Sequence, residues 1–329
     1  MCLPSAAKHC KKRAMVAKVL AVADPSCGAF LFILPSVGAT LLEIGYDFKS
    51  FSAESLAEAD VLLLRGEHDI IGEAFEYLYP LLSKNKLKWV HACSAGIGFL
   101  LHSQCGPDFI NDGVFLTNAR GCYSQALAEY TMCACLYFNK QTSLLRQNHN
   151  GCEWDQFVMP QLLGKTMGIV GYGDIGSKVA TLAKAFNMKV WGLRSRPERS
   201  KDDVLLDKLL GASEMELVTL MQNADFIVVS LPSTASTENW IDKSKLVHMK
   251  KTAVIINIGR GSTLNEDDLC DCLEAGMIKG AALDVFKVEP LPLESRLWKI
   301  PSDRLLLSPH NADKVSISYK NQDFSHRNL

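Results

Sequence analysis

The sequence lacks an excess of either charge sign, and it lacks a long uninterrupted apolar run. Its 35 basic and 36 acidic residues give a formal net charge of -1, which gives no reason to expect nucleic acid or an acidic membrane surface as a partner. The nearest candidate for a membrane span, residues 29–42, is shorter than the ~20 apolar residues that a bilayer requires and contains Pro35 and Gly38. Internal repeats and low-complexity segments are absent as well. We therefore expect an ordinary globular protein without a nucleic-acid or membrane partner.

The eleven cysteines lack the spacing of a disulfide framework or a zinc site. No C-x-x-C occurs, and Cys133/Cys135 and Cys270/Cys272 are i, i+2 pairs in helical patterns, which do not face one another. The odd total and the lack of a secretory leader predict reduced thiols, a cytoplasmic protein and no metal site. Basic residues before Asp24 faintly resemble an organelle transit peptide, but only one of them is arginine, so a basic tail is the preferred interpretation.

A glycine motif between an apolar run and an amphipathic segment is the most informative stretch of the chain. The order is strand (residues 167–170), tight turn and helix, which is typical of a dinucleotide-binding fold. Gly171 permits the turn, Gly173 lets the backbone approach a pyrophosphate, and Gly176 lets the helix pack closely on the strand. The phosphates are expected over unpaired N–H groups at the start of the helix. The predicted phosphate-binding turn consists of Gly171, Gly173, Asp174, Ile175 and Gly176.

A second cofactor signal lies at the end of the next apolar run, 23 residues beyond Gly171. A carboxylate usually stands about 20 residues past the glycines, where it binds the ribose hydroxyls of NAD. Here the sequence reads Arg194-Ser195-Arg196. Because a guanidinium can pair with a 2′-phosphate that a carboxylate would repel, we expect NADP to be preferred over NAD. The alternative is that both arginines are solvated loop charges.

Short apolar runs separated by mixed or helical segments predict two α/β domains with parallel, doubly wound sheets. A first domain is expected over residues 1–119 and a cofactor domain over residues 120–312. Residues 124–137 read as a helix, residues 146–154 as an exposed loop, and residues 27–51 permit no assignment. The expected strands of the first domain are 16–22, 61–64, 88–90 and 114–116. Six strands are expected in the second: 167–170, 189–193, 226–231, 253–257, 280–285 and 305–307.

Three polar residues follow predicted strands at their carboxyl ends, where open α/β sheets bind ligands. Arg260, Glu289 and His310 come after the runs that end near residues 257, 285 and 307. Each residue could have a purely structural role. Their order, downstream of a dinucleotide fingerprint, instead predicts a catalytic site.

At these residues the chain resembles the D-isomer-specific 2-hydroxyacid dehydrogenases, most closely the glyoxylate/hydroxypyruvate reductase branch. The resemblance covers roughly residues 55 to 313 and implies a flavodoxin-like substrate domain, a Rossmann cofactor domain and a homodimer. The matching motifs are residues 163–176, Ile256-Asn-Ile-Gly-Arg-Gly261, residues 283–292 and Ser308-Pro-His-Asn-Ala312, with weaker matches at Ser94-Ala-Gly96 and Ala128-Glu-Tyr130.

The expected reaction is reduction of a small 2-keto acid by NAD(P)H. Arg260 can bind the substrate carboxylate and polarise the carbonyl group. His310 can donate the proton, because its ordinary pKa of roughly 6.5 lets it cycle near neutral pH, and Glu289 would orient it and favour its protonated form. Backbone N–H groups near Ala95 and Gly96 are expected to bind the carboxylate as well. By resemblance, Asp284 would contact the nicotinamide carboxamide, and further cofactor contacts are implied for Pro232, Thr237, Ile258 and His310.

Two features depart from the family pattern. Tyr130 stands where many members have histidine, which leaves the three catalytic residues unchanged. The family usually ends in a helix that returns to the first domain, whereas only 19 residues follow His310. The return element, residues 313–329, is therefore expected to be short or incomplete, which bears on domain closure and dimer contacts.

Other function classes share this fold. Dehydrogenase-like nucleotide-sensing proteins, such as transcriptional corepressors, keep the same three residues, but the chain lacks the long disordered flanks that would recruit partners. Phosphoglycerate dehydrogenase is an enzyme alternative, although no additional regulatory domain is present. Formate dehydrogenase is disfavoured, because its substrate needs no keto-acid chemistry and it generally prefers NAD.

Overall fold

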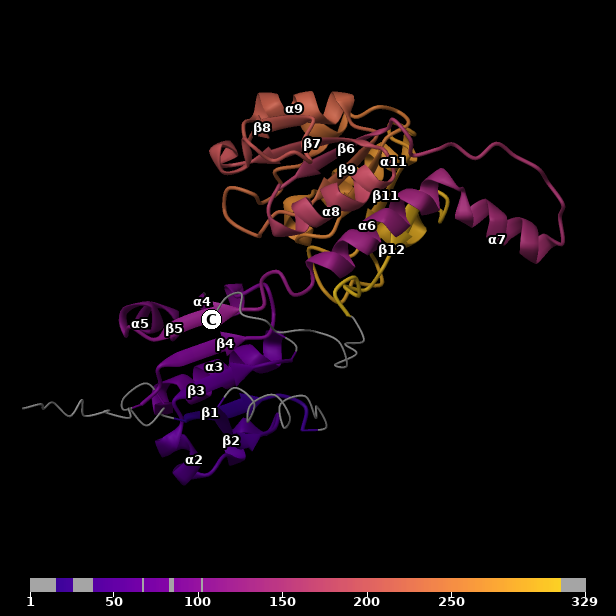
Figure 1. Cartoon of the computed structure of the whole chain (residues 1–329). Helices are drawn as coiled ribbons and strands as arrows, with labels where there is room; N and C mark the ends of the chain where they lie inside the picture. Colours follow the sequence, from indigo (N-terminus) through magenta and orange to yellow (C-terminus); the bar gives the residue numbers. More distant parts are fainter. Residues whose placement is uncertain (1–15, 26–37, 67, 83–85, 102, 315–329) are drawn as a thin grey trace, which may run out of the picture. The chain divides into compact units, whose positions relative to one another are not determined.

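The computed structural model describes residues 16–25, 38–66, 68–82, 86–101 and 103–314, which form two compact units (Figure 1). The boundary between the units lies between Arg120 and Gly121. Each unit is built on one parallel sheet with helices packed against it, so the predicted α/β class is confirmed. Within the described residues, no helix is both long enough and apolar enough to span a membrane, and no three His, Cys, Asp or Glu side chains gather as metal ligands would.

The first unit contains a five-stranded parallel sheet in the order β2-β1-β3-β4-β5. This is the flavodoxin-like order, and strand β2 lies in the stretch that the sequence left unassigned. Leu20, Leu62 and Val90 of the central strands pack with Phe75 and Leu78 of α3 to form the core. The elements are β1 (Ala17–Val22), β2 (Ala39–Ile44), η1 (Phe48–Ser50), α2 (Ala53–Glu58), β3 (Val61–Leu64), α3 (His68–Leu82), β4 (Trp89–Ala92), α4 (Gly98–Leu101), α5 (Gly106–Asn111) and β5 (Phe115–Asn118).

The second unit contains seven parallel strands in the order β12-β11-β10-β9-β6-β7-β8. Six of them match the predicted runs. The seventh, β8, pairs with β7 at the edge of the sheet, so the prediction of six strands was wrong by one. The strands are β6 (Thr166–Val170), β7 (Lys189–Arg194), β8 (Lys208–Gly211), β9 (Phe226–Val229), β10 (Val254–Asn257), β11 (Gly280–Leu283) and β12 (Leu305–Leu307).

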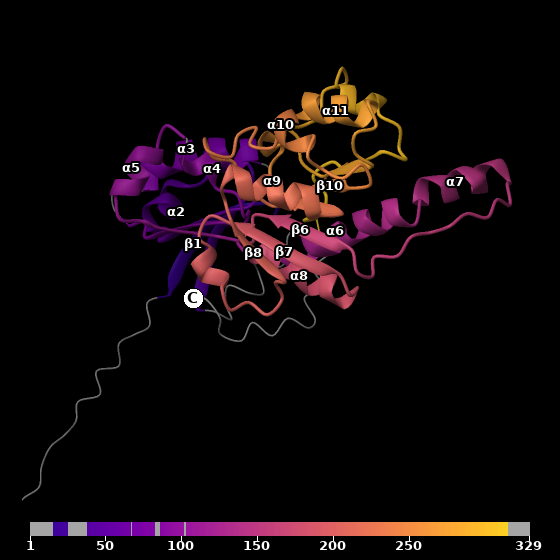
Figure 2. The same cartoon turned by 90° about the horizontal axis from the view of Figure 1, so that it is seen from above.

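Helices cover both faces of this second sheet, as a doubly wound fold requires. One face packs against α6 and α8, and the other against α9, α10 and α11. Figure 2 shows α8 and α9 on opposite sides of β6 and β7. The helices are α6 (Ser124–Asn139), α7 (Thr142–Gly151), α8 (Asp174–Ala185), α9 (Glu214–Asn223), α10 (Lys243–Leu246) and α11 (Glu266–Glu274); short 3-10 turns are η2 (Pro197–Ser200), η3 (Gly261–Thr263) and η4 (Arg296–Lys299).

The prediction of an exposed loop over residues 146–154 was wrong, because most of that stretch belongs to helix α7. The helix continues outward from α6, away from the strands (Figures 1 and 2). Its polar side chains face solvent on most sides, so the sequence offers no broad apolar stripe from which a helix can be recognised. The predictions for the N-terminal basic residues before Val16 and for a return element lie outside the described residues, apart from Asp313 and Lys314.

Candidate active site

The glycine turn after β6 has the geometry that close backbone packing demands. Gly171 has a left-handed backbone, with φ of 100°, and a Cβ built on it would lie 2.8 Å from the carbonyl oxygen of Ser230. A Cβ on Gly176 would lie 2.9 Å from the side chain of Ile169, so α8 packs directly on β6 only because residue 176 has no side chain. Ser230, at the end of β9, also donates to the carbonyl oxygen of Gly171 at 2.9 Å.

Gly173 differs from Gly171 and Gly176, because no described residue lies close enough to exclude a side chain at position 173. A Cβ built there would have no neighbour closer than the oxygen of Gly171 at 4.0 Å, among the described residues. Helix α8 starts at the next residue, and no described side chain caps its first turn. Asp174 is held aside by the hydroxyl of Ser124 from α6. Open space before uncapped N–H groups fits the pyrophosphate of a dinucleotide.

Arg194 is fixed at the end of β7. Its guanidinium donates to Ser200, a buried residue of η2, and the Arg194 side chain is half-buried, whereas Ser195 and Arg196 are exposed. An arginine held in this way offers its remaining N–H groups without first losing side-chain freedom. The pattern fits a cofactor that carries a phosphate on its adenosine ribose.

Three further predicted cofactor residues, Pro232, Thr237 and Ile258, lie after the ends of β9 and β10. The Thr237 hydroxyl donates to the carbonyl oxygen of Pro232 at 2.7 Å and accepts from the N–H of Thr234 at 2.9 Å, so these residues form one closed turn after β9. Ile258 is buried and donates its N–H to Val229 at 3.1 Å. Because parallel strands end at one edge, these residues share the edge that carries the glycine turn.

Arg260 follows β10 in a turn shaped by Asn257. The buried Asn257 side chain accepts from the N–H of Gly259 and donates to the carbonyl oxygen of Arg260, both at 3.1 Å. The Arg260 guanidinium is half-buried and donates to the oxygen of Gly259 at 2.7 Å. Asn257 was not among the predicted site residues; its polarity at the end of an apolar strand was the signal that could have found it.

Glu289 and His310 form a direct pair, although they lie 21 positions apart in the sequence. The imidazole Nδ1 lies 2.8 Å from Glu289 Oε2, and each side chain is about one-third exposed. The hydrogen bond and charge of Glu289 raise the pKa of His310 against the opposing effect of burial. Burial would raise the pKa of Glu289, but bonds from His310 and from the N–H of Phe286, with the nearby charge of Arg260, outweigh it and lower that pKa. The pair therefore favours a protonated imidazole beside a carboxylate.

Asp284 lies beneath the turn that carries His310. Its side chain is 1% exposed, and its carboxylate accepts from Ser308 Oγ at 2.6 Å and from the N–H groups of Asn311 and Ala312 at 2.9 and 3.2 Å. The main-chain oxygen of Asp284 accepts from the N–H of His310 at 2.9 Å. These contacts give Asp284 a structural role beside the predicted contact with the nicotinamide, which stays a prediction.

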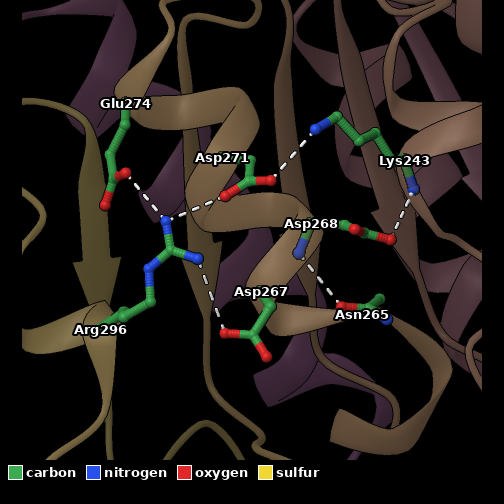
Figure 3. A network of polar contacts seen from close by, with 7 residues as sticks. All are labelled: Lys243, Asn265, Asp267, Asp268, Asp271, Glu274 and Arg296. Carbon is green, nitrogen blue, oxygen red and sulfur yellow. Dashed lines mark hydrogen bonds and ion pairs between the residues drawn. The ribbon is translucent and has the colours of Figure 1, made fainter.

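The loop that carries Glu289 is attached to α11 at two points. Near its start, the N–H of Lys287 donates to Glu266 at 2.7 Å. Near its end, Arg296 forms ion pairs with three carboxylates of α11, and one of these, Asp271, also pairs with Lys243 (Figure 3). The loop is therefore anchored on both sides of Glu289. The three carboxylates are those of Asp267, Asp271 and Glu274, at 3.7, 3.0 and 2.8 Å from Arg296 nitrogens.

Ala95 and Gly96 lie in the first unit, on the loop between β4 and α4. Ser94 Oγ donates to the oxygen of Gly96 at 2.8 Å, and Asn118 donates to the oxygen of Ala95 at 2.7 Å. The carbonyl groups of this loop are thus engaged, and Ala95 is exposed. The role of its N–H groups toward a carboxylate stays a prediction.

The sequence is similar to known dehydrogenases and reductases. The family model described as "D-isomer specific 2-hydroxyacid dehydrogenase, NAD binding domain" matches residues 132–312. The chain is 29% identical to a glyoxylate reductase of Pyrococcus horikoshii, over 84% of this chain and 83% of the relative. It is 30% identical to a D-3-phosphoglycerate dehydrogenase of Methanocaldococcus jannaschii, over 91% of this chain but only 54% of that longer protein.

Among solved structures, a D-isomer specific 2-hydroxyacid dehydrogenase family protein from Aeromonas salmonicida has a similar fold. The TM-score is 0.76 at 28% identity, and the alignment covers 90% of this chain and 89% of the other. The similarity thus extends over both units of the described chain.

Proposed function

Because the chain belongs to the D-isomer specific 2-hydroxyacid dehydrogenases, we propose that it reduces a small 2-keto acid, glyoxylate or hydroxypyruvate, to the D-2-hydroxy acid. The observation that carries this proposal is the 2.8 Å contact between His310 and Glu289, with the charge of Arg260 close enough to Glu289 to lower its pKa. All three residues follow strands of the sheet whose carboxyl edge also carries the glycine turn.

The proposed mechanism assigns one task to each side chain. The guanidinium of Arg260 binds the substrate carboxylate and polarises the carbonyl oxygen, where negative charge develops during reduction. His310 donates a proton to that oxygen from Nε2, since Nδ1 is held by Glu289. Glu289 stays ionised and stabilises the imidazolium before the transfer. The bound nicotinamide would supply the hydride.

In the first unit, we assign the N–H groups of Ala95 and Gly96 to the second oxygen of the substrate carboxylate. Their loop follows a strand end, and the hydrogen bonds that Ser94 and Asn118 donate hold its carbonyl groups in place. A carboxylate needs donors, which the backbone N–H groups of this loop would supply. The substitution Gly96→Pro removes one such donor and should raise KM for the keto acid with little change in cofactor affinity.

NADPH is the proposed cofactor. Arg194, Ser195 and Arg196 stand where a carboxylate would select NAD, and Arg194 is already positioned by Ser200. The uncapped start of α8 and the open space at Gly173 would hold the pyrophosphate. Thr237, Pro232, Ile258 and Asp284 would line the remaining length of the cofactor.

We also propose a homodimer, formed through α7 and the segment that follows it. This arm carries exposed apolar side chains, among them Trp154 (93% exposed) and Val158 (86% exposed). Apolar groups in such numbers on an extended segment fit a surface that another copy covers. Light scattering after size exclusion should give twice the chain mass, and Trp154→Asp should shift the protein toward the monomer.

The test of the activity is a substrate panel with both reduced nucleotides. Glyoxylate, hydroxypyruvate and 3-phosphohydroxypyruvate are each mixed with the protein and NADPH or NADH, and the loss of absorbance of the reduced nicotinamide is followed. We expect the fastest turnover with NADPH and one of the first two acids, and none with His310→Gln, which should still bind NADPH. Preference for the phosphorylated acid would favour phosphoglycerate dehydrogenase. Binding of NADPH without any turnover would instead favour a nucleotide-sensing binding protein.

A further inference from the structure

Tyr130 of α6 is joined to the His310 turn by a continuous chain of hydrogen bonds. Its hydroxyl oxygen lies 2.7 Å from Ser308 Oγ, which in turn lies 2.6 Å from Asp284 Oδ1. The residues come from three separate parts of the second unit, 178 positions apart at the widest. The sequence suggested that a tyrosine at position 130 leaves the catalytic residues unaffected, whereas these contacts connect it to them.

The chemistry of the three groups determines which one donates each hydrogen bond. A carboxylate can only accept, so the single hydroxyl proton of Ser308 is donated to Asp284. The oxygen of Ser308 then accepts from the Tyr130 hydroxyl, which can donate its proton as well as accept one. Burial raises the pKa of Tyr130 to about 12, so its proton is present throughout the working range of pH. Tyr130 thereby orients the Ser308 hydroxyl toward the carboxylate.

Asp284, the end of this chain, holds His310 in an uncommon backbone conformation. His310 has a φ of 52°, in the left-handed region that residues other than glycine rarely adopt. Such a conformation persists only where neighbouring groups hold it. Here the main-chain oxygen of Asp284 binds the N–H of His310, and its carboxylate binds the N–H groups of the next two residues.

From these contacts we propose that Tyr130 is a positioning residue, which acts through Ser308 and Asp284 to hold the His310 imidazole against Glu289. The inference rests on the proposed function, because the positioned imidazole is the proposed proton donor. Tyr130 touches neither substrate nor cofactor in this scheme. Its contribution comes entirely from the orientation of the turn of residues 308–312.

The test compares two tyrosines of the same helix. Tyr130→Phe removes the hydroxyl that begins the chain, and Ser308→Ala breaks its middle. Tyr137→Phe is the matched control, because the Tyr137 hydroxyl donates to the carbonyl oxygen of Ser302 at 2.6 Å, outside the chain. Loss of a neutral hydrogen bond corresponds to roughly three- to tenfold in an equilibrium, so we expect Tyr130→Phe to lower kcat by about that factor with KM nearly unchanged. Ser308→Ala removes a hydrogen bond to a carboxylate and should lower kcat by roughly ten- to hundredfold, again with KM nearly unchanged.

A second readout does not depend on turnover. The carboxylates of Glu289, Asp313 and Asp284 each raise the pKa of His310, and Glu289, which contacts the imidazole at 2.8 Å, has the largest effect. If the turn loosens, contact with Glu289 weakens, and the NMR titration midpoint of His310 in the protein without cofactor should move to lower pH. His310→Asn identifies the resonance. Tyr137→Phe should leave both kcat and this midpoint unchanged, even if it lowers the melting temperature.

The outcomes separate the two proposals. A Tyr130→Phe variant whose kcat and His310 titration match those of Tyr137→Phe would overturn the positioning role. Ser308→Ala, which must show the same two changes, decides the matter if Tyr130→Phe folds poorly. If the wild-type protein reduces no keto acid, the proposed function fails. The titration still tests whether Tyr130 holds the His310 imidazole against Glu289.

Discussion

Gly261 and Phe286 lie so close together that no side chain fits between them: a Cβ built on Gly261 would be 1.8 Å from the carbonyl carbon of Phe286. Gly261 follows Arg260, and the N–H of Phe286 donates to Glu289 at 2.9 Å. The close approach of these two backbones therefore sets how near the Arg260 turn comes to the loop that carries Glu289. Glycine at position 261 is required by space, since its φ is not in the left-handed region.

Gly261→Ala should separate the two backbones and reduce activity strongly. Overpacking costs roughly 1–3 kcal/mol, and more where the obstacle is backbone, so we expect a fall in kcat/KM of about tenfold or more. Steady-state kinetics and thermal unfolding measure the two effects. Gly72→Ala is the control, since a Cβ there would be 3.8 Å from Phe99 and should leave both quantities intact. Unchanged kinetics in Gly261→Ala would show that the spacing of the two loops is irrelevant.

Glu289→Gln should move the pH dependence of reduction to lower pH. The proton donor must be protonated, so kcat/KM falls as pH rises through the pKa of His310, which Glu289 raises. Glutamine keeps the shape but not the charge, and the fall should begin at lower pH, with roughly tenfold less activity at neutral pH. Glu294→Gln, on the same loop but exposed, should behave like the wild type. If wild type, Glu289→Gln and Glu294→Gln all showed the same pH dependence of kcat/KM, Glu289 would not control the protonation of His310.

The same pair predicts how stability depends on pH. His310 has a raised pKa, so its contribution is complete below the ordinary value of 6.5 and is lost as pH rises through the raised value. Glu289 has a lowered pKa, so its contribution is present above the ordinary value of 4.5 and is lost as pH falls through the lowered value. The difference in unfolding free energy between wild type and Glu289→Gln should be largest between those two values. Denaturant unfolding of both proteins at about pH 5.5 and about pH 9 measures this difference. A larger difference in unfolding free energy at the alkaline pH would contradict the prediction.

Arg194→Ala should weaken NADPH binding selectively. A hydrogen bond to a charged group contributes about 1.5–3 kcal/mol, so the Kd for NADPH should rise roughly ten- to hundredfold while that for NADH changes little. Fluorescence titration with each nucleotide provides the measurement. Arg199→Ala removes an exposed arginine of the adjacent η2 turn and is the matched control. Equal losses for both nucleotides would indicate that Arg194 does not recognise the 2′-phosphate.

Arg296→Ala should destabilise the Glu289 loop modestly and in a salt-dependent way. The three carboxylates that it bridges stand on one helix and would repel one another in its absence (Figure 3). Because Arg296 and its partners are largely open to solvent, water and ions screen the attraction, so the loss should be small and high salt should reduce it further. Urea unfolding at two salt concentrations measures it. Lys299→Ala, at the exposed end of the same turn, should cause no comparable loss.

Much of the fold was recognisable from local pattern. The order of strand, glycine turn and helix identified the cofactor domain, and the apolar runs located most of its strands. Strand β8 was missed because Lys208–Gly211 is short, lies at the sheet edge and follows a polar stretch. The sequence predicts a loop where α7 lies because little of this helix is buried, so its residues do not show the apolar periodicity that packing against a core would require.

The candidate site was predictable only in part. The positions of Arg260, Glu289 and His310 after strand ends predicted that they share one edge. The bonds of Asn257, Ser308 and Tyr130 depend on side-chain orientation and on residues far apart in the chain, which a single sequence does not specify. The close approach at Gly261 likewise depends on the path of a second loop.

The left-handed backbone at His310 decides which replacement gives a clean experiment. Asparagine enters that region more readily than most residues, whereas glutamine gains no such advantage. A defect in His310→Gln therefore mixes a lost ring with a disturbed main chain. His310→Asn keeps the left-handed backbone conformation more easily, so its loss of activity reports on the missing imidazole alone.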